Sequence, residues 1–64
     1  MTGAQVGDRV QIVLQTRYLY QEGVIKGYTG KGKQKIYMIF LDSGQVVMVQ
    51  QKYCRLLKTN KHVN

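Results

Sequence analysis

Residues 35–50 read Lys-Ile-Tyr-Met-Ile-Phe-Leu-Asp-Ser-Gly-Gln-Val-Val-Met-Val-Gln, two apolar runs on either side of a short polar turn. The first run, from Lys35 to Asp42, is apolar on both faces, a pattern typical of a central strand. Asp42 to Gln45 predicts a tight turn, because Gly44 can take the positive φ that a hairpin needs and Asp42 can hydrogen-bond the turn that it begins. Val46 to Gln50 then predicts the second strand of a β-hairpin.

The segments on both sides of this hairpin have the same short-strand character. Residues 15–20 form a connector, and residues 22–28 predict a strand in which two glycines allow a bend. Downstream, residues 50–53 can form one helical turn before a final short strand at residues 54–57. Near the N-terminus, residues 6–14 alternate in polarity and predict a half-buried strand whose apolar face carries Val6, Val10, Ile12 and Leu14.

The whole pattern predicts an all-β fold, a five-stranded small barrel. The chain lacks proline and any apolar stripe of helical length, and its short strands recur at a spacing of roughly 8–12 residues, as in barrels and sandwiches. A barrel is favoured because closure removes exposed sheet edges. We assign residues 6–57 to the barrel, residues 1–5 to a flexible N-terminus and residues 58–64 to a flexible basic and polar C-terminal tail.

Size and charge limit the classes of function. Sixty-four residues form one domain with a thin core, in which a deep catalytic pocket is not expected. Ten Lys and Arg outnumber three Asp and Glu, and the net charge of +7 favours an anionic partner such as nucleic acid, a membrane surface or an acidic protein. No apolar run approaches the roughly 20 residues that span a bilayer, and no secretion signal is recognisable, so we expect a cytoplasmic protein with no membrane partner.

No group of residues predicts catalysis or the binding of a metal or cofactor. Cys54 is the single cysteine and predicts a buried structural thiol, the alternative being a reactive thiol tuned by Arg55. The three acidic residues are isolated in the sequence, and His62 stands alone, so nothing suggests an acid–base pair or a metal site. We predict that the protein is not an enzyme.

Three short motifs stand at characteristic places: Gly7-Asp-Arg-Val10, Met38-Ile-Phe-Leu-Asp-Ser-Gly44 and Cys54-Arg-Leu-Leu57. They resemble the G-D-x-V start, the middle V-x-F-x-D-Y-G and the L-R-x-L ending of SH3-like small barrels, most closely the Tudor type. The resemblance covers residues 6–57 and implies a binding module. Related SH3-like barrels bind DNA or RNA, and others dock onto acidic redox proteins.

One departure from the Tudor pattern concerns the aromatic cage with which some Tudor domains read methylated lysine or arginine. Ser43 stands where the family usually has the tyrosine of D-Y-G. Phe40 matches the family's phenylalanine, and Tyr18, Tyr20 or Tyr28 could supply other walls. A domain of charge +7 would also repel the basic peptides that such cages bind. The missing tyrosine and the positive charge therefore argue against the reading of methylated cations.

The glycine-rich stretch Gly27-Tyr-Thr-Gly-Lys-Gly-Lys-Gln-Lys35 predicts the binding site. It almost spells a phosphate loop, but Gln34 replaces the magnesium-binding Ser or Thr and a strand follows, so nucleotide hydrolysis is rejected. Its lysines suit nucleic-acid phosphates, and nearby tyrosines suit base stacking. The alternative is a solvated hairpin whose lysines only prevent edge aggregation. The candidate contact residues are Arg17, Tyr18, Tyr20, Lys26, Tyr28, Lys31, Lys33, Lys35 and Tyr37.

We therefore predict a small basic nucleic-acid-binding module in which lysines hold phosphates and tyrosines stack, with weak sequence specificity. The chief alternative is a protein-docking subunit or adaptor that binds an acidic protein within a larger complex. The sequence leaves open the choice between DNA and RNA, between single and double strands, and the oligomeric state.

Overall fold

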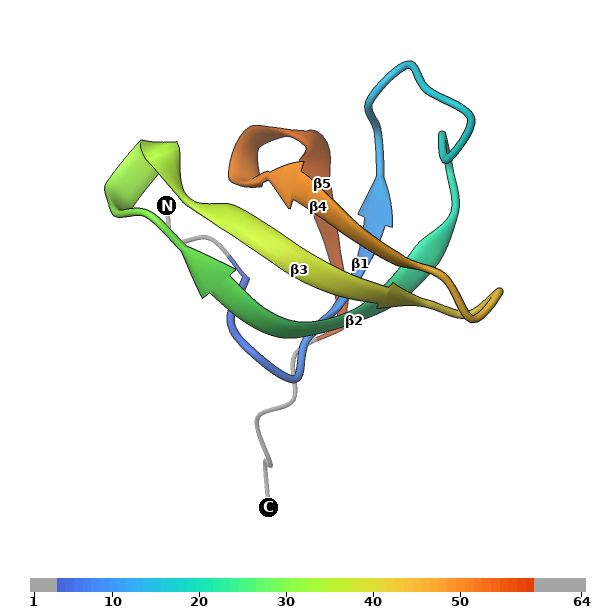
Figure 1. Ribbon diagram of the computed structural model, residues 1–64, viewed down its shortest axis with the longest axis horizontal. Helices are drawn as coiled ribbons and strands as arrows, with labels where there is room; N and C mark the ends of the chain where they lie inside the picture. The colour runs from blue at the N-terminus through green and yellow to red at the C-terminus, as the bar shows by residue number, and fades with distance from the viewer. Residues whose placement is uncertain (1–3, 59–64) are drawn as a thin grey trace.

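The computed structural model of the chain describes residues 4–58 and consists of one antiparallel β-sheet (Figure 1). The order of hydrogen-bonded strands is β4-β3-β2-β1-β5. The predicted all-β fold of five strands is confirmed, and no α-helix occurs within residues 4–58. The strands are β1 (Arg9–Ile12), β2 (Glu22–Thr29), β3 (Ile36–Leu41), β4 (Val46–Gln50) and β5 (Cys54–Lys58), and the single 3₁₀ turns are η1 (Gly32–Gln34) and η2 (Gln51–Tyr53).

The predicted strand at residues 6–14 is shorter in the structure, because a turn occupies its first part. The Asp8 N–H donates to the Gln5 carbonyl, and the Gln5 N–H donates to the Asp8 carboxylate. Gly7 in this turn has a φ of 96°. The turn leaves Val6 52% exposed, so Val6 is not part of the apolar face that the alternation predicted.

The sheet curls but does not close, so the predicted barrel closure is wrong. In the described sheet, β4 and β5 are the two edges, and no ladder joins them. The reason lies in η2. The Gln51 N–H still bonds to the Lys35 carbonyl on the β3 side, whereas the Tyr53 carbonyl already accepts from Val13 on the β1 side. The chain thus crosses the end of the sheet instead of forming a hairpin between β4 and β5.

The inner face of the curled sheet holds the hydrophobic core. Successive side chains of a strand alternate between faces, so alternate residues of β1, β3 and β4 are buried here. The predicted burial of the alternating apolar residues in β1 is confirmed for Val10 and Ile12, both 0% exposed. The complete core set is Ala4, Val10, Ile12, Ile25, Tyr37, Ile39, Leu41, Val47 and Val49.

The ends of the chain fall largely outside the described residues. Residues 1–3 of the predicted flexible N-terminus are outside, but Ala4 is buried and its carbonyl accepts a hydrogen bond from the Tyr37 hydroxyl. Of the predicted tail at residues 58–64, only Lys58 is described, and it is the last residue of β5.

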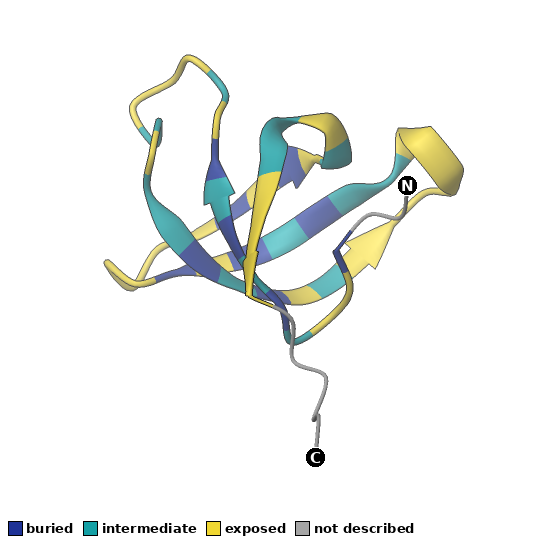
Figure 2. Ribbon diagram, turned by 180° about the vertical axis from the view of Figure 1, so that it is seen from behind, coloured by how far each residue is buried: buried dark blue, intermediate teal, exposed yellow. Residues whose placement is uncertain are grey.

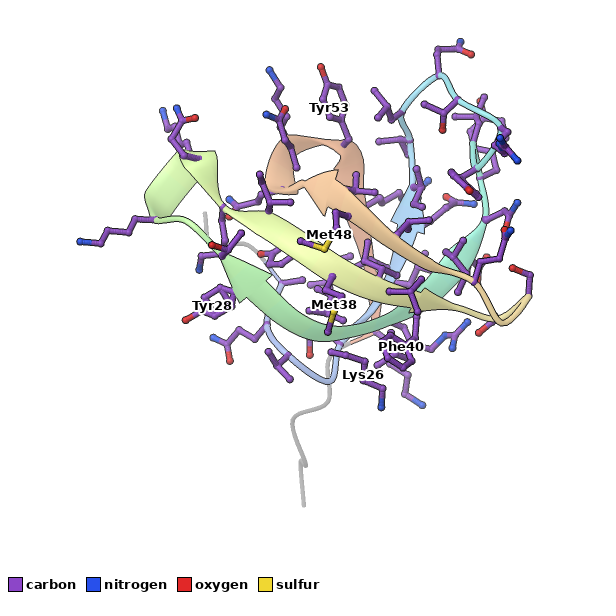
Figure 3. All side chains as sticks on the ribbon, viewed as in Figure 1. Lys26, Tyr28, Met38, Phe40, Met48 and Tyr53 are labelled. Carbon is purple, nitrogen blue, oxygen red and sulfur yellow. The ribbon has the colours of Figure 1, made fainter. Side chains whose placement is uncertain are left out.

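The outer face of β3 and β4 carries exposed apolar residues. β3 is an interior strand that pairs with β2 and β4, as its two apolar faces predicted. Because Tyr37 and its alternate neighbours point inward, Met38 and Phe40 point outward, and Phe40 is 44% exposed. On the adjacent strand β4, Val46 and Met48 are 53% and 57% exposed. Figure 3 labels Met38 and Phe40 on β3 and Met48 on β4.

A β-bulge bends β2 and turns its last residues. The pairing register with β3 shifts between Ile25 and Gly27, so Lys26 is an extra residue in the strand. Tyr28 consequently pairs directly with Tyr37 and lies on the side of the sheet that carries the core. The two glycines of β2 predicted a bend in this strand, and the bulge is the form that the bend takes.

Arg9 binds two of the chain's carboxylates. Its Nη1 and Nη2 donate to Asp42 Oδ1 and Oδ2 at 3.2 and 2.6 Å, and Nη2 lies 3.5 Å from Glu22 Oε1. The hydrogen bond from Arg9 lowers the pKa of Asp42 below its ordinary value. The Asp42 side chain was predicted to hydrogen-bond its own turn; its carboxylate instead ties that turn to β1.

Candidate functional site

Three segments gather at one end of the sheet: loop 13–21, loop 30–35 and η2 (Figure 1). We call this region the loop end. Hydrogen bonds place η2 between the two loops, because the Val13 N–H donates to the Tyr53 carbonyl and the Gln51 N–H donates to the Lys35 carbonyl, each at 2.9 Å. The loop end therefore brings together residues that are far apart in the sequence.

Glycines shape loop 30–35 and present its lysines to solvent. Gly30 and Gly32 have φ values of 86° and 55°, in the left-handed region that glycine adopts at little cost. The Gln34 N–H donates to the Lys31 carbonyl and closes the η1 turn. Lys31 and Lys33 are exposed on this turn (Figure 2). The two lysines are thus held on a short, hydrogen-bonded turn.

Lys35 and Tyr28 form a pair beside this turn. The Lys35 Nζ lies 4.6 Å from the centroid of the Tyr28 ring, a favourable cation–π distance. Tyr28 is 55% exposed, since it extends beyond the core along β2. The pair combines a cation with an accessible aromatic ring.

Lys52 and Tyr53 join the site through η2, and sequence analysis did not identify either residue. The Lys52 Nζ lies 5.2 Å from the centroid of the Tyr53 ring. A helical turn at residues 50–53 was predicted and is confirmed as η2, but no local signal indicates that this turn contacts η1. Only the crossing from β4 to β5 brings Lys52 towards the lysines of loop 30–35.

Loop 13–21 carries the three predicted contacts of the connector. The Arg17 Cζ lies 5.7 Å from the centroid of the Tyr18 ring, and Tyr18 is half-buried against the core. Tyr20 is 66% exposed and has a φ of 69°, with its N–H donating to the Ile12 carbonyl at 2.7 Å. One tyrosine of this loop therefore packs inward and the other is accessible.

Two predicted contact residues lie away from the loop end. Tyr37 is 1% exposed because it lies on the inward side of β3, so its ring is not available at the surface for the predicted contact. Lys26 is exposed but sits at the bulge, where its Nζ lies 5.9 Å from the centroid of the Phe40 ring on the outer face (Figure 3). The aromatic residues considered for a cage are also separated, because Phe40 points outward while Tyr28 lies on the core side.

All charged residues in the three segments of the loop end are basic, because these segments contain no Asp or Glu. Glu22 and Asp42 pair with Arg9, and Asp8 is buried before β1. Within residues 4–58, none of the cations of the loop end makes a salt bridge. These cations are Arg17, Lys31, Lys33, Lys35 and Lys52.

Cys54 is predicted to be chemically inert, and the structure supplies the reason. Burial raises the pKa of its thiol from 9.0 to about 11, and its Sγ lies 3.5 Å from the Gln50 carbonyl oxygen. Two pKa units mean about 100-fold less thiolate near neutral pH, and the thiolate is the reactive species. We expect alkylation by iodoacetamide to be about 100-fold slower in the native protein than in the urea-unfolded chain. Cys54 is half-buried in the structure, where the sequence predicted full burial, and equal rates would contradict even this partial shielding.

Comparison of the chain with family models, with curated protein sequences and with solved structures gave no match. In the described part of the chain, no three of His, Cys, Asp and Glu lie close enough to hold a metal ion, and His62 lies outside that part. No helix among the described residues is long and apolar enough to cross a membrane.

Proposed function

We propose that this domain is a small nucleic-acid-binding module of SH3-like, Tudor-like architecture, without catalytic activity. The observation that carries the proposal is the composition of the loop end, where three segments supply cations and tyrosines and no carboxylate. The architecture is supported by five antiparallel strands in the order β4-β3-β2-β1-β5, with a 3₁₀ turn between the last two strands of the chain.

Phosphates are the ligands that this set of cations fits best. Lysines on exposed turns neutralise phosphates and release counterions, which gives affinity that is independent of sequence and sensitive to salt. Five phosphate contacts correspond to a slope of log K against log salt of about −3.5 for single strands and −4.5 for duplexes. A shallower slope would mean that fewer cations of the loop end take part.

Aromatic rings at the loop end would add contacts to bases. Tyr20 and Tyr28 are more than half exposed, and a lysine occupies one side of the Tyr28 ring. A base can stack on the other side of such a ring while the lysine neutralises the adjoining phosphate. Stacking contributes about 1–3 kcal/mol per base and tolerates every base, which accounts for weak sequence specificity.

The test is direct binding to labelled single- and double-stranded DNA and RNA between about 50 and 200 mM salt, the range over which phosphate contacts weaken measurably. Heparin serves as the polyanion control. We expect micromolar or tighter binding that prefers one nucleic acid to heparin and quenches tyrosine fluorescence. Binding that heparin matches, without quenching, would contradict the proposal and direct the search to an acidic protein partner.

A further inference from the structure

β4 is an unprotected edge strand. Its sequence, Val46–Gln50, contains no charge and no proline, and its pairing with β3 has no register shift. Natural edge strands usually carry lysine, proline or a bulge, because these features block pairing with another strand. The opposite edge, β5, has such features: Arg55 and Lys58 lie on it, and its register with β1 shifts. The chain therefore protects one edge and leaves the other available.

The backbone of β4 offers hydrogen-bonding groups at this edge. Gln45 and Gln51, on either side of the strand, bond to β3. Alternate residues of an antiparallel strand face the same neighbour, so the N–H and C=O groups of Val46, Met48 and Gln50 face away from β3. Within the described residues, these groups of β4 have no main-chain partner at the edge. The Cys54 thiol lies beside the Gln50 carbonyl.

The geometry points to a second copy of this chain as the occupant of the β4 edge, paired antiparallel about a two-fold axis at Met48. In this register Met48 faces Met48 of the second copy, and Val46 faces its Gln50. Residues whose backbone groups point to the edge are thus opposite one another, as a ladder requires. On the inner side, Val47 faces Val49 of the second copy, a favourable pair of β-branched residues. The strand is therefore complementary to itself.

Charge selects the antiparallel arrangement. The net charge of +7 on each copy opposes association, and the cations concentrate at the loop end, beyond the last residue of β4. Antiparallel pairing places the two loop ends at opposite ends of a strand that is about 17 Å long, whereas the Debye length is about 8 Å at physiological salt.

The same pairing also covers part of the apolar surface on the outer face of the sheet. Val46 and Met48 are more than half exposed on β4, beside the exposed Phe40 of β3. Pairing covers the edge of this apolar surface and extends it across two copies. A contact between two five-residue strands is small, so the dimer is expected to be weak and concentration-dependent.

Sedimentation velocity of the full chain, without nucleic acid, tests the dimer over about 10 to 500 μM, where weak interfaces associate. We expect the mass to rise towards twice 7.4 kDa. Met48→Lys and Met48→Glu should each remain monomeric, because like charges face one another at the two-fold axis. An equimolar mixture of the two variants should associate again. The exposure of Met48 makes both variants compatible with the fold.

Leu57→Lys is the matched control, since Leu57 is an exposed apolar residue of the other edge strand. It should associate as the native chain does. Hydrogen exchange gives an independent readout: the amides of Val46 and Met48 should gain protection with rising concentration, whereas that of Val47 should not change. A monomer at all concentrations, a dimer that Leu57→Lys abolishes, or a mixture that fails to associate would overturn the inference. Because these measurements contain no nucleic acid, they do not depend on the proposed function.

Discussion

Gly23→Ala is expected to unfold much of the domain, because β2 has no room for a methyl group at this position. A Cβ placed on Gly23 would lie 2.4 Å from the Phe40 carbonyl oxygen and 2.8 Å from the Leu41 Cα. Both atoms belong to the backbone of β3, which cannot move without breaking the central ladder. Overpacking costs about 1–3 kcal/mol even where side chains can adjust, and we expect about 3 kcal/mol or more here. For a domain of this size that loss lowers Tm by about 12 to 24 °C.

Gly27→Ala in the same strand is the control. Its added Cβ would meet only the Met38 Cε, at 3.4 Å, which is ordinary contact with a flexible side chain. We expect its stability to stay within about 1 kcal/mol of the native value, since the change also restricts the unfolded chain. Thermal and urea unfolding followed by circular dichroism would measure both variants. Equal stabilities for Gly23→Ala and Gly27→Ala would show that β2 and β3 do not pack as closely as described.

Replacing Lys31, Lys33 and Lys35 together with Ala is expected to lower nucleic-acid affinity by roughly 50- to 170-fold at about 0.15 M salt. Each phosphate contact contributes a factor of about 4 to 6 at this salt concentration through counterion release. The slope of log K against log salt should fall in magnitude by about 2 to 3. Adding Lys52→Ala should cost about another 4- to 6-fold, although no sequence signal assigned this residue to the site.

The control variant for this experiment loses three positive charges from residues outside the loop end. Lys26, Arg55 and Lys58 are exposed and lie outside the loop end. Their combined replacement with Ala also lowers the net charge by three, yet we expect it to change affinity by less than about 5-fold, because long-range attraction is screened. If the two triple variants bind equally, only net charge matters and the loop end is not the interface. Fluorescence anisotropy with one labelled oligonucleotide would compare them.

The sequence predicted the local elements well where short-range chemistry determines them. The turn at residues 42–45 requires a positive φ, and Gly44 supplies it at 99°. β4 has the predicted bounds, and the alternation around Val10 and Ile12 indicated the inner face. The first strand was predicted too long, because apolar alternation continues through Val6 while hydrogen bonds between Gln5 and Asp8 form a turn.

For the same reason, the sequence predicted the exposure of some candidate site residues and not of others. A lysine in a glycine-rich turn is exposed whatever the tertiary structure, and Lys31 and Lys33 are exposed as predicted. A tyrosine inside a strand can face either way, and the β-bulge at Lys26 moved Tyr28 to the side of the core-facing Tyr37. The glycines of β2 indicated a bend, but the position of the register shift depends on the pairing between two strands.

The sequence by itself determined an all-β domain of five short strands, its tight turns and its excess of positive charge, because these properties depend on neighbouring residues and on composition. The tertiary structure alone decided that the sheet stays open between β4 and β5, that Arg9 gathers Glu22 and Asp42, and that η2 brings Lys52 and Tyr53 to loop 30–35. Each of these features joins segments that are distant along the chain. They follow from how the strands pair and cross in space, which local patterns do not encode.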